Sequence, residues 1–121
     1  MKADAQQFIA ILFLSRDIAH KAHLNSDKYS EHVALADFYD GIVDLADKFC
    51  EAWMGRNLKQ IGDIPRLESP KTEILKSLKT YLDIIEETRD FVRKEDSALN
   101  NIIDEIVALY LSTIYKLTFP K

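Results

Sequence analysis

Apolar side chains recur every three or four residues in four segments of this chain, which is the spacing of one face of an α-helix. The segments cover approximately residues 3–24, 29–54, 70–92 and 97–117. Their apolar stripes include Phe8, Ile11 and Leu12, then Phe38, Ile42 and Leu45, then Leu78, Leu82 and Ile85, and finally Ile103, Ile106 and Tyr110. Four amphipathic helices that must bury these stripes together predict an all-α protein built as a four-helix bundle.

Residues that favour turns and helix caps separate the four segments. Asn25-Ser26-Asp27 makes a short break after the first segment, and Gly55 stands where a helix C-cap favours glycine. Ser69-Pro70 reads as an N-cap followed by the first position of the third helix. Asp96, or the serine after it, reads as the cap of the fourth helix. The short breaks predict two antiparallel hairpins.

One long connection, residues 56–68, joins the second and third predicted helices. At ~3.3 Å per residue it could just cross the length of a helix of about 25 residues, which rises ~1.5 Å per residue. This length permits a ferritin-like bundle with one crossover, and a plain up-down-up-down bundle with a loose loop stays open. We predict that residues 1–121 form a single domain.

Residues 8–14 read Phe-Ile-Ala-Ile-Leu-Phe-Leu, which is apolar on every face of nearly two helical turns. One bundle buries only one stripe of a helix, so a second apolar face needs another partner. We therefore expect a homodimer or a larger homo-oligomer through the first helix. The alternative is a helix that is deeply buried inside a wide bundle.

Composition excludes several classes of function. The net charge is −4, and the lysine and arginine residues are scattered rather than clustered, so the chain lacks the basic stripe of nucleic acid binding. No apolar run approaches the ~20 residues of a membrane span, and the N-terminus does not read as a signal peptide, so we expect a cytoplasmic protein. Cys50 is the only cysteine, so it forms no intrachain disulfide and reads as a packed thiol.

The histidines and part of the acidic residues form a pattern that could carry chemistry. Arg16, His20 and His23 share one face of the first predicted helix, and His32 begins the second. An acidic stripe follows along one face of the second helix: Asp37, Asp40, Asp44, Asp47 and Glu51. This stripe is either the solvated face of that helix or, if buried, a site that requires cations.

The order and spacing of these residues resemble the Dps family of ferritin-like proteins. Ala22-His-Leu-Asn is similar to the His-Trp-Asn of that family, and an aromatic residue, Tyr29, precedes the second histidine, His32. Asp47 follows His32 by fifteen residues and Glu51 follows Asp47 by four, which matches the family pattern. Leu24 stands in place of the tryptophan, and the lysine-rich tail that binds DNA in the family is absent.

The resemblance implies an intersubunit metal site and a ferroxidase activity. It assigns His23 and His32 as imidazole ligands from one subunit, and Asp47 and Glu51 as carboxylate ligands from the other. Such a ligand set suits iron, as a di-iron centre, with manganese or zinc as substitutes. His20 and the acids near Asp47 would orient ligands or guide metal entry. We do not expect DNA binding.

Two other interpretations stay open. The chain could be a metal-free helical adaptor that binds a partner through the apolar face of its first helix. Arg16 and His23 are also spaced as Arg-x6-His, which is seen in HEPN-type ribonuclease bundles that cleave RNA without metal.

Overall fold

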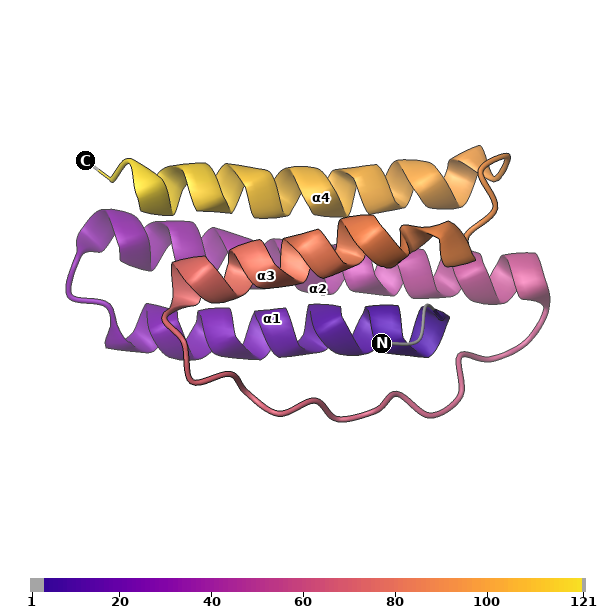
Figure 1. Ribbon diagram of the computed structural model, residues 1–121, viewed down its shortest axis with the longest axis horizontal. Helices are drawn as coiled ribbons and strands as arrows, with labels where there is room; N and C mark the ends of the chain where they lie inside the picture. Colours follow the sequence, from indigo (N-terminus) through magenta and orange to yellow (C-terminus); the bar gives the residue numbers. More distant parts are fainter. Residues whose placement is uncertain (1–3, 121) are drawn as a thin grey trace.

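Four helices lie side by side in the computed structural model, which describes residues 4–120 (Figure 1). They are α1 (Ala5–Asn25), α2 (Tyr29–Asn57), α3 (Ile74–Thr88), continued by the short 3-10 helix η1 (Arg89–Phe91), and α4 (Ser97–Thr118). The prediction of an all-α four-helix bundle is therefore confirmed. Ala3, the predicted start of the first helix, lies outside the described residues.

The helices are connected in the order of a bundle with one long crossover. α1 and α4 run in one direction and α2 and α3 in the other (Figure 1). α1 packs against α2 and α3, and α4 packs against the same two helices, so each helix has antiparallel neighbours. Residues 58–73, here called the strap, run back along the bundle from the end of α2 to the start of α3. This is the ferritin-like connectivity, and connectivity alone defines no function.

The strap also covers α1. Ile61, Ile64 and Leu67, spaced by three residues, pack against the hydrophobic core from outside. The side-chain amide of Gln6 in α1 donates to the carbonyl of Ile61 at 2.7 Å and holds the strap in place. All apolar residues of the segment 8–14 are buried except the partly exposed Phe13. The prediction that a second apolar face of the first helix is free for a partner is thus wrong. The homo-oligomer that was inferred from this free face stays a prediction, but the face no longer supports it.

The end of α2 differs from the sequence prediction. The helix passes through Gly55 and ends at Asn57, with Leu58 at its C-cap. Leu58 has φ 53°, in the left-handed region that favours glycine, and the backbone N–H of Lys59 donates to the carbonyl of Met54 at 3.3 Å. Because Leu58 is exposed, its side chain gains little from the strained conformation.

The start of α3 was also predicted too early. Ser69 and Pro70 belong to the strap, and Glu73 is the N-cap. The Glu73 carboxylate accepts from the backbone N–H of Leu75 at 3.2 Å and of Lys76 at 2.8 Å. A carboxylate satisfies two unpaired N–H groups of the first turn, which a serine hydroxyl could do less well.

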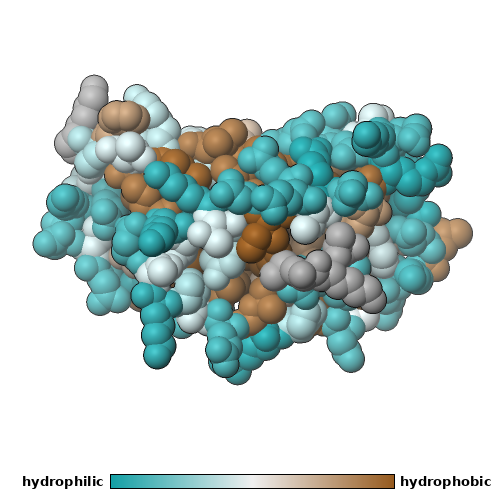
Figure 2. All heavy atoms as spheres, in the orientation of Figure 1, coloured by the Kyte–Doolittle hydropathy of each residue, from teal (hydrophilic) through white to brown (hydrophobic). Residues whose placement is uncertain are grey.

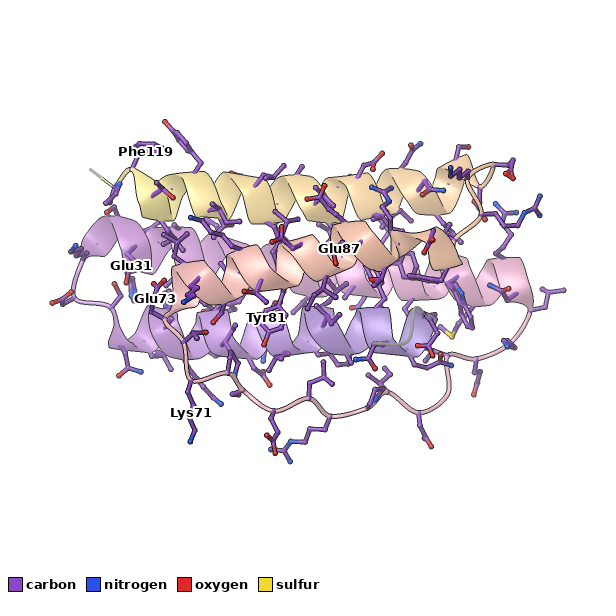
Figure 3. All side chains as sticks on the ribbon, in the orientation of Figure 1. Glu31, Lys71, Glu73, Tyr81, Glu87 and Phe119 are labelled. Atoms are coloured by element: carbon purple, nitrogen blue, oxygen red, sulfur yellow. The ribbon has the colours of Figure 1, made fainter. Side chains whose placement is uncertain are left out.

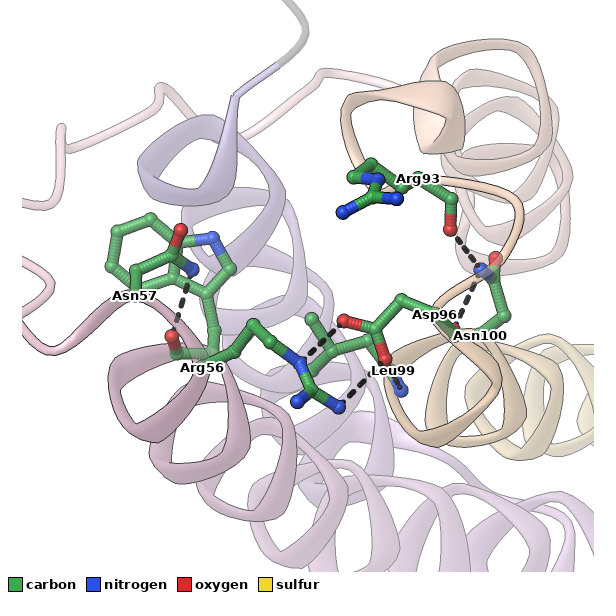
Figure 4. Close-up of polar contacts among 7 residues, drawn as sticks. Arg56, Asn57, Arg93, Asp96, Leu99 and Asn100 are labelled. Atoms are coloured by element: carbon green, nitrogen blue, oxygen red, sulfur yellow. Dashed lines mark hydrogen bonds and ion pairs between the residues drawn. The ribbon is translucent and has the colours of Figure 1, made fainter.

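A polar clasp ties the end of α2 to the start of α4 (Figure 4). The Arg56 guanidinium donates to both carboxylate oxygens of Asp96, at 2.8 Å and 3.2 Å. Asp96 also caps α4 by accepting from the backbone N–H of Leu99 at 3.2 Å, as its position in the sequence predicts. These hydrogen bonds hold the pKa of Asp96 below its usual range, with the bond from Arg56 as the largest cause. The clasp therefore persists well below neutral pH.

One polar pair lies in the centre of the apolar core. Tyr110 of α4 donates its hydroxyl hydrogen to the hydroxyl of Ser15 in α1 at 2.6 Å, and both side chains are fully buried. The ring of Phe38 in α2 meets the Tyr110 ring edge-on at 5.0 Å between centroids. Burial raises the pKa of Tyr110 far above its usual value, so the phenol stays protonated. The pair links α1 and α4 across the diagonal of the bundle.

The surface is mixed in polarity. Figure 2 shows hydrophobic atoms in the middle of the viewed face and at the end where α4 finishes, between broad hydrophilic areas. Within residues 4–120, no helix combines the length and the apolar character that a bilayer crossing requires.

We expect Tyr110→Phe to lower the free energy of unfolding by about 1–2 kcal/mol, because it removes a buried hydrogen bond and leaves the Ser15 hydroxyl in apolar surroundings. Urea unfolding followed by circular dichroism measures this. The double variant Tyr110→Phe/Ser15→Ala should lose less than the two single losses added together, by about 1 kcal/mol. Strictly additive losses would show that the two hydroxyls do not interact.

Leu58→Gly should raise stability, because glycine adopts the left-handed conformation at this C-cap without steric cost. After subtraction of the greater flexibility of glycine in the unfolded chain, we expect a gain of about 0.5 kcal/mol. Thermal unfolding should show a Tm higher by about 2 °C for this gain. Leu58→Ala is the control, since alanine keeps the strain, and an equal gain in both variants would contradict the explanation.

Candidate functional site

His23 and His32 form a reciprocal pair, here called the histidine latch, at the turn between α1 and α2. The Nδ1 atom of His23 donates to the backbone carbonyl of His32 at 2.6 Å, and Nδ1 of His32 donates to the carbonyl of His23 at 2.9 Å. A carbonyl oxygen can only accept, so both Nδ1 atoms carry hydrogen. The two rings are stacked, with centroids 3.7 Å apart. The latch closes the α1–α2 hairpin one turn inside its loop.

Two further aromatic side chains extend the latch along the α1–α2 seam. The ring of Tyr39 stacks on His20 at 4.3 Å between centroids and meets His23 edge-on at 5.4 Å. Arg16, one turn before His20, forms an ion pair with Asp17 at 3.2 Å. Both residues of the Arg-x6-His pattern thus have partners within the chain, and the ribonuclease interpretation stays an untested prediction.

Asp47 and Glu51 lie far from the latch in the same chain. Both are exposed on the outer side of α2, and Asp47 lies fifteen residues after His32, about 22 Å along the helix axis. Asp37, Asp40 and Asp44, the other residues of the acidic stripe, are exposed as well. The stripe is therefore the solvated face of α2, which was one of the two interpretations of the sequence.

The four predicted ligands do not fit a metal within one chain. The two histidines are in contact, and Asp47 and Glu51 lie one turn apart on α2, but the fold keeps the two pairs away from each other. Among residues 4–120, no group of three or more histidine, cysteine, aspartate or glutamate side chains is placed to hold a metal ion. A site shared between two chains is not tested by one chain and stays a prediction.

Cys50 is half-buried beside two carboxylates. Burial is the main cause that raises the pKa of its thiol, and the negative charges of Asp47 and Glu51 raise it further. A thiol with a raised pKa is protonated at neutral pH, so it is a poor nucleophile. This environment agrees with the packed thiol expected from the sequence.

An apolar groove of about 430 Å³ lies at the end of the bundle, between the first turns of α2 and the last turns of α4. We call it the end groove. Its three aromatic residues are strongly exposed: Tyr29 by 82%, Phe119 by 66% and Tyr115 by 62%. Phe119, labelled at the end of α4, and Glu31, labelled near the start of α2, lie at this same end (Figure 3). The groove is lined by Tyr29, Ser30, Val33, Ala34, Asp37, Tyr115, Lys116, Phe119 and Pro120.

Packing from both helices fixes the shape of the end groove. The buried Ala34 contributes a small side chain to its lining, which leaves room between the two helices. The rings of Tyr115 and Phe119 pack against each other at 5.6 Å, and the backbone N–H of Phe119 donates to the carbonyl of Tyr115 at 3.0 Å. Most of the lining residues belong to α2 and α4, and Phe119 and Pro120 follow directly after the end of α4 at Thr118. The groove is therefore largely preformed by the helices.

A second, larger hollow of about 840 Å³ lies between α1 and the strap. Phe13 of α1 reaches it, and charges of both signs line it: Asp17 and Lys21 from α1, and Arg66 and Glu68 from the strap. Because these charges are mixed, they favour no particular class of ligand.

The fold and these sites define a small helical bundle with one crossover, and the comparisons with known proteins place it in a family. The model described as "Family of unknown function (DUF5856)" matches residues 23–117, most of the chain, so the chain belongs to this family. An uncharacterized 14.6 kDa protein of the mobD–ri intergenic region of Enterobacteria phage T4 is 24% identical over 115 residues, covering 94% of this chain and 88% of that protein. No solved structure matches the chain.

These findings correct the resemblance to the Dps family. The matching family is a different one, and neither its description nor that of the phage relative names a ferritin or an iron protein. The described residues of one chain also hold no metal-binding group. The iron and oxidoreductase assignments depended on the resemblance and are withdrawn with it.

Sequence reasoning singled out the two histidines but did not foresee the hydrogen bonds that join them, and it missed the end groove entirely. The latch could have been expected from position, because residues 23 and 32 lie within one helical turn of the break between α1 and α2, on either side of it. The groove had a signal too: Tyr29 and Val33 in one segment, and Tyr115 and Phe119 in another, are apolar or aromatic residues four apart that lie off the buried stripes, near the start of α2 and the end of α4.

We expect His32→Ala to lower the free energy of unfolding by about 1–2 kcal/mol, because it removes one hydrogen bond and the ring stack of the latch. His32→Phe should recover part of this loss, since it keeps a ring but no donor. Urea unfolding in the presence of EDTA measures both changes without any contribution from metal.

Asp47→Ala is the matched control for a shared metal site. Because Asp47 is exposed, this substitution should change the free energy of unfolding by less than about 0.5 kcal/mol. If His32→Ala and Asp47→Ala lower the free energy of unfolding equally, and only when EDTA is absent, the result would contradict the latch and support a metal site shared between chains.

Proposed function

We propose that this protein is a small helical interaction protein that binds a partner through its end groove. The observation that carries the proposal is the gathering of Tyr29, Val33, Tyr115 and Phe119 around one preformed hollow on the surface. Contiguous exposed apolar patches on small proteins mark interaction sites more often than chance exposure. Tyrosine and phenylalanine are also the residues enriched in the buried centres of interfaces.

This proposal keeps the adaptor interpretation but moves its binding surface. The sequence pointed to the apolar face of the first helix, and the strap covers that face. The end groove lies instead between α2 and α4, and its exposed apolar side chains are not part of the hydrophobic core. A partner that fills it would bury the exposed rings against the small Ala34, which is the geometry of an anchoring pocket.

Peptides selected from a random library against the whole protein test the proposal. We expect the selected peptides to bind Val33→Asn at least about tenfold more weakly than the wild type, because an anchor in the groove loses apolar contact worth about 1.4 kcal/mol or more. Fluorescence anisotropy of labelled peptides gives the two dissociation constants.

Val43→Asn is the matched control. Val33 and Val43 lie on the same helix with almost the same exposure, 38% and 37%, and only Val33 lines the groove. The control should retain the wild-type affinity. Selection of peptides that bind both variants equally, or a library that yields no binder, would reject the end groove as a binding site.

A further inference from the structure

We infer that the occupant of the end groove is a basic amphipathic helix of a partner protein, laid along the α2–α4 seam. This inference rests on the proposed function and specifies its partner. It depends on two features that meet at one residue: Asp37 lines the apolar groove and is also the first member of the acidic stripe.

The shape of the seam favours a helix. α2 and α4 run antiparallel and pack closely, so that a side chain at Gly41 would meet Leu109 at 3.1 Å. The surface between two packed helices is a shallow trough parallel to their axes, and a third helix fits such a trough at an axial distance of about 8–10 Å. The α2 segment from Tyr29, in the groove, to Asp44 is about 22 Å long, the length of a helix of about 15 residues.

The charge along the seam favours a basic partner. From the edge of the groove onward the exposed side of α2 carries Asp37, Asp40 and Asp44, and none of them forms an ion pair within residues 4–120. Lys48 on the same helix is already paired with Glu105 of α4 at 3.1 Å. Lys116 is the basic residue of the groove lining. The stripe is therefore a row of uncompensated negative charge that begins where the apolar contacts end.

The same charge argues against other occupants. A second copy of the chain on this surface would bring two acidic stripes together across a twofold axis, because such an interface uses the same patch on both copies. Like charges held in contact oppose that pairing. Nucleic acid and anionic membranes are repelled for the same reason.

The geometry also gives the pattern of the partner helix. Apolar residues at positions i, i+3 or i+4, and i+7 in one half would contact the groove. Lysine or arginine at the same spacing in the other half would meet Asp37, Asp40 and Asp44, which follow one another at steps of three and four residues.

Three synthetic peptides test this inference on the whole protein. They share one apolar half with leucine and phenylalanine anchors, and they carry lysine, glutamine or glutamate at three positions of the other half. We expect the lysine peptide to bind about tenfold tighter than the glutamine peptide, because it forms three exposed charge pairs that the glutamine peptide lacks. The glutamate peptide should bind weakest, and added salt should reduce the difference.

Two triple variants with the same change in net charge locate the effect. Asp37→Asn/Asp40→Asn/Asp44→Asn should abolish the advantage of the lysine peptide. Asp83→Asn/Glu86→Gln/Glu87→Gln neutralises three exposed acids on α3 and should retain it (Glu87 is labelled in Figure 3).

The outcomes separate this inference from the proposed function. If the glutamine peptide binds in a Val33-dependent way and the lysine peptide binds no tighter, the groove stands and the basic partner is rejected. If both triple variants remove the advantage equally, only net charge acts and the inference is again overturned. If Val33→Asn leaves the dissociation constants of the peptides unchanged, the groove itself is rejected as the binding site. Self-association of the wild type that Val33→Asn abolishes would identify a second copy as the occupant and overturn the inference.

Discussion

The enclosure of α1 is the constraint on which the rest of this structure depends. A helix with apolar residues on all sides must be surrounded. α1 packs directly against α2 and α3, whereas α4 lies across the diagonal, so the helices alone do not enclose α1. The strap supplies the missing wall with Ile61, Ile64 and Leu67. Because the strap must lie along α1, it has to travel the length of the bundle, and α3 then starts at the end where α2 starts.

This arrangement leaves the functional surfaces to the other helices. The side of α2 that faces away from α1 and the core carries the acidic stripe, and the ends of α2 and α4 carry the end groove. These two surfaces meet at Asp37. The histidine latch, in contrast, lies between α1 and α2, where its Nδ1 atoms bond backbone carbonyls and stabilise the hairpin. The protein thus separates the residues that hold the fold from those available to a partner.

The sequence allowed prediction of whatever depends on periodicity or on local caps. The four helices, the short break between the first two and the cap of the fourth are set by residues close together in the chain, and all three are found, with Asp96 as the cap of the two candidates. Gly55 and Ser69-Pro70 predicted the end of α2 and the start of α3 wrongly, because contacts with distant residues decide these two boundaries. Arg56 bonds Asp96 across the bundle, and the segment before Glu73 is held as part of the strap. The three-residue spacing of Ile61, Ile64 and Leu67 in the strap was visible in the sequence, but it matches no regular element.

The candidate site was harder to predict because its residues can serve either structure or chemistry. His23 and His32 come together as the ligand hypothesis requires, yet hydrogen bonds to each other's carbonyls account for their proximity. A spacing of fifteen residues on one straight helix keeps Asp47 and His32 of the same chain apart, so only a second chain could bring a carboxylate to these imidazoles. Spacing that matches a family pattern therefore does not distinguish a shared role from coincidence.

The buried hydroxyl pair has a consequence for how the helices align lengthwise. Isoleucine and leucine side chains can interlock in several axial registers with similar energy, so an apolar core alone selects poorly among them. A slide of α1 against α4 by one turn would separate Ser15 from Tyr110 and leave two hydroxyl groups in hydrocarbon surroundings. The pair thus fixes the axial register of α1 against α4, because a misaligned bundle would leave both hydroxyl groups without a partner.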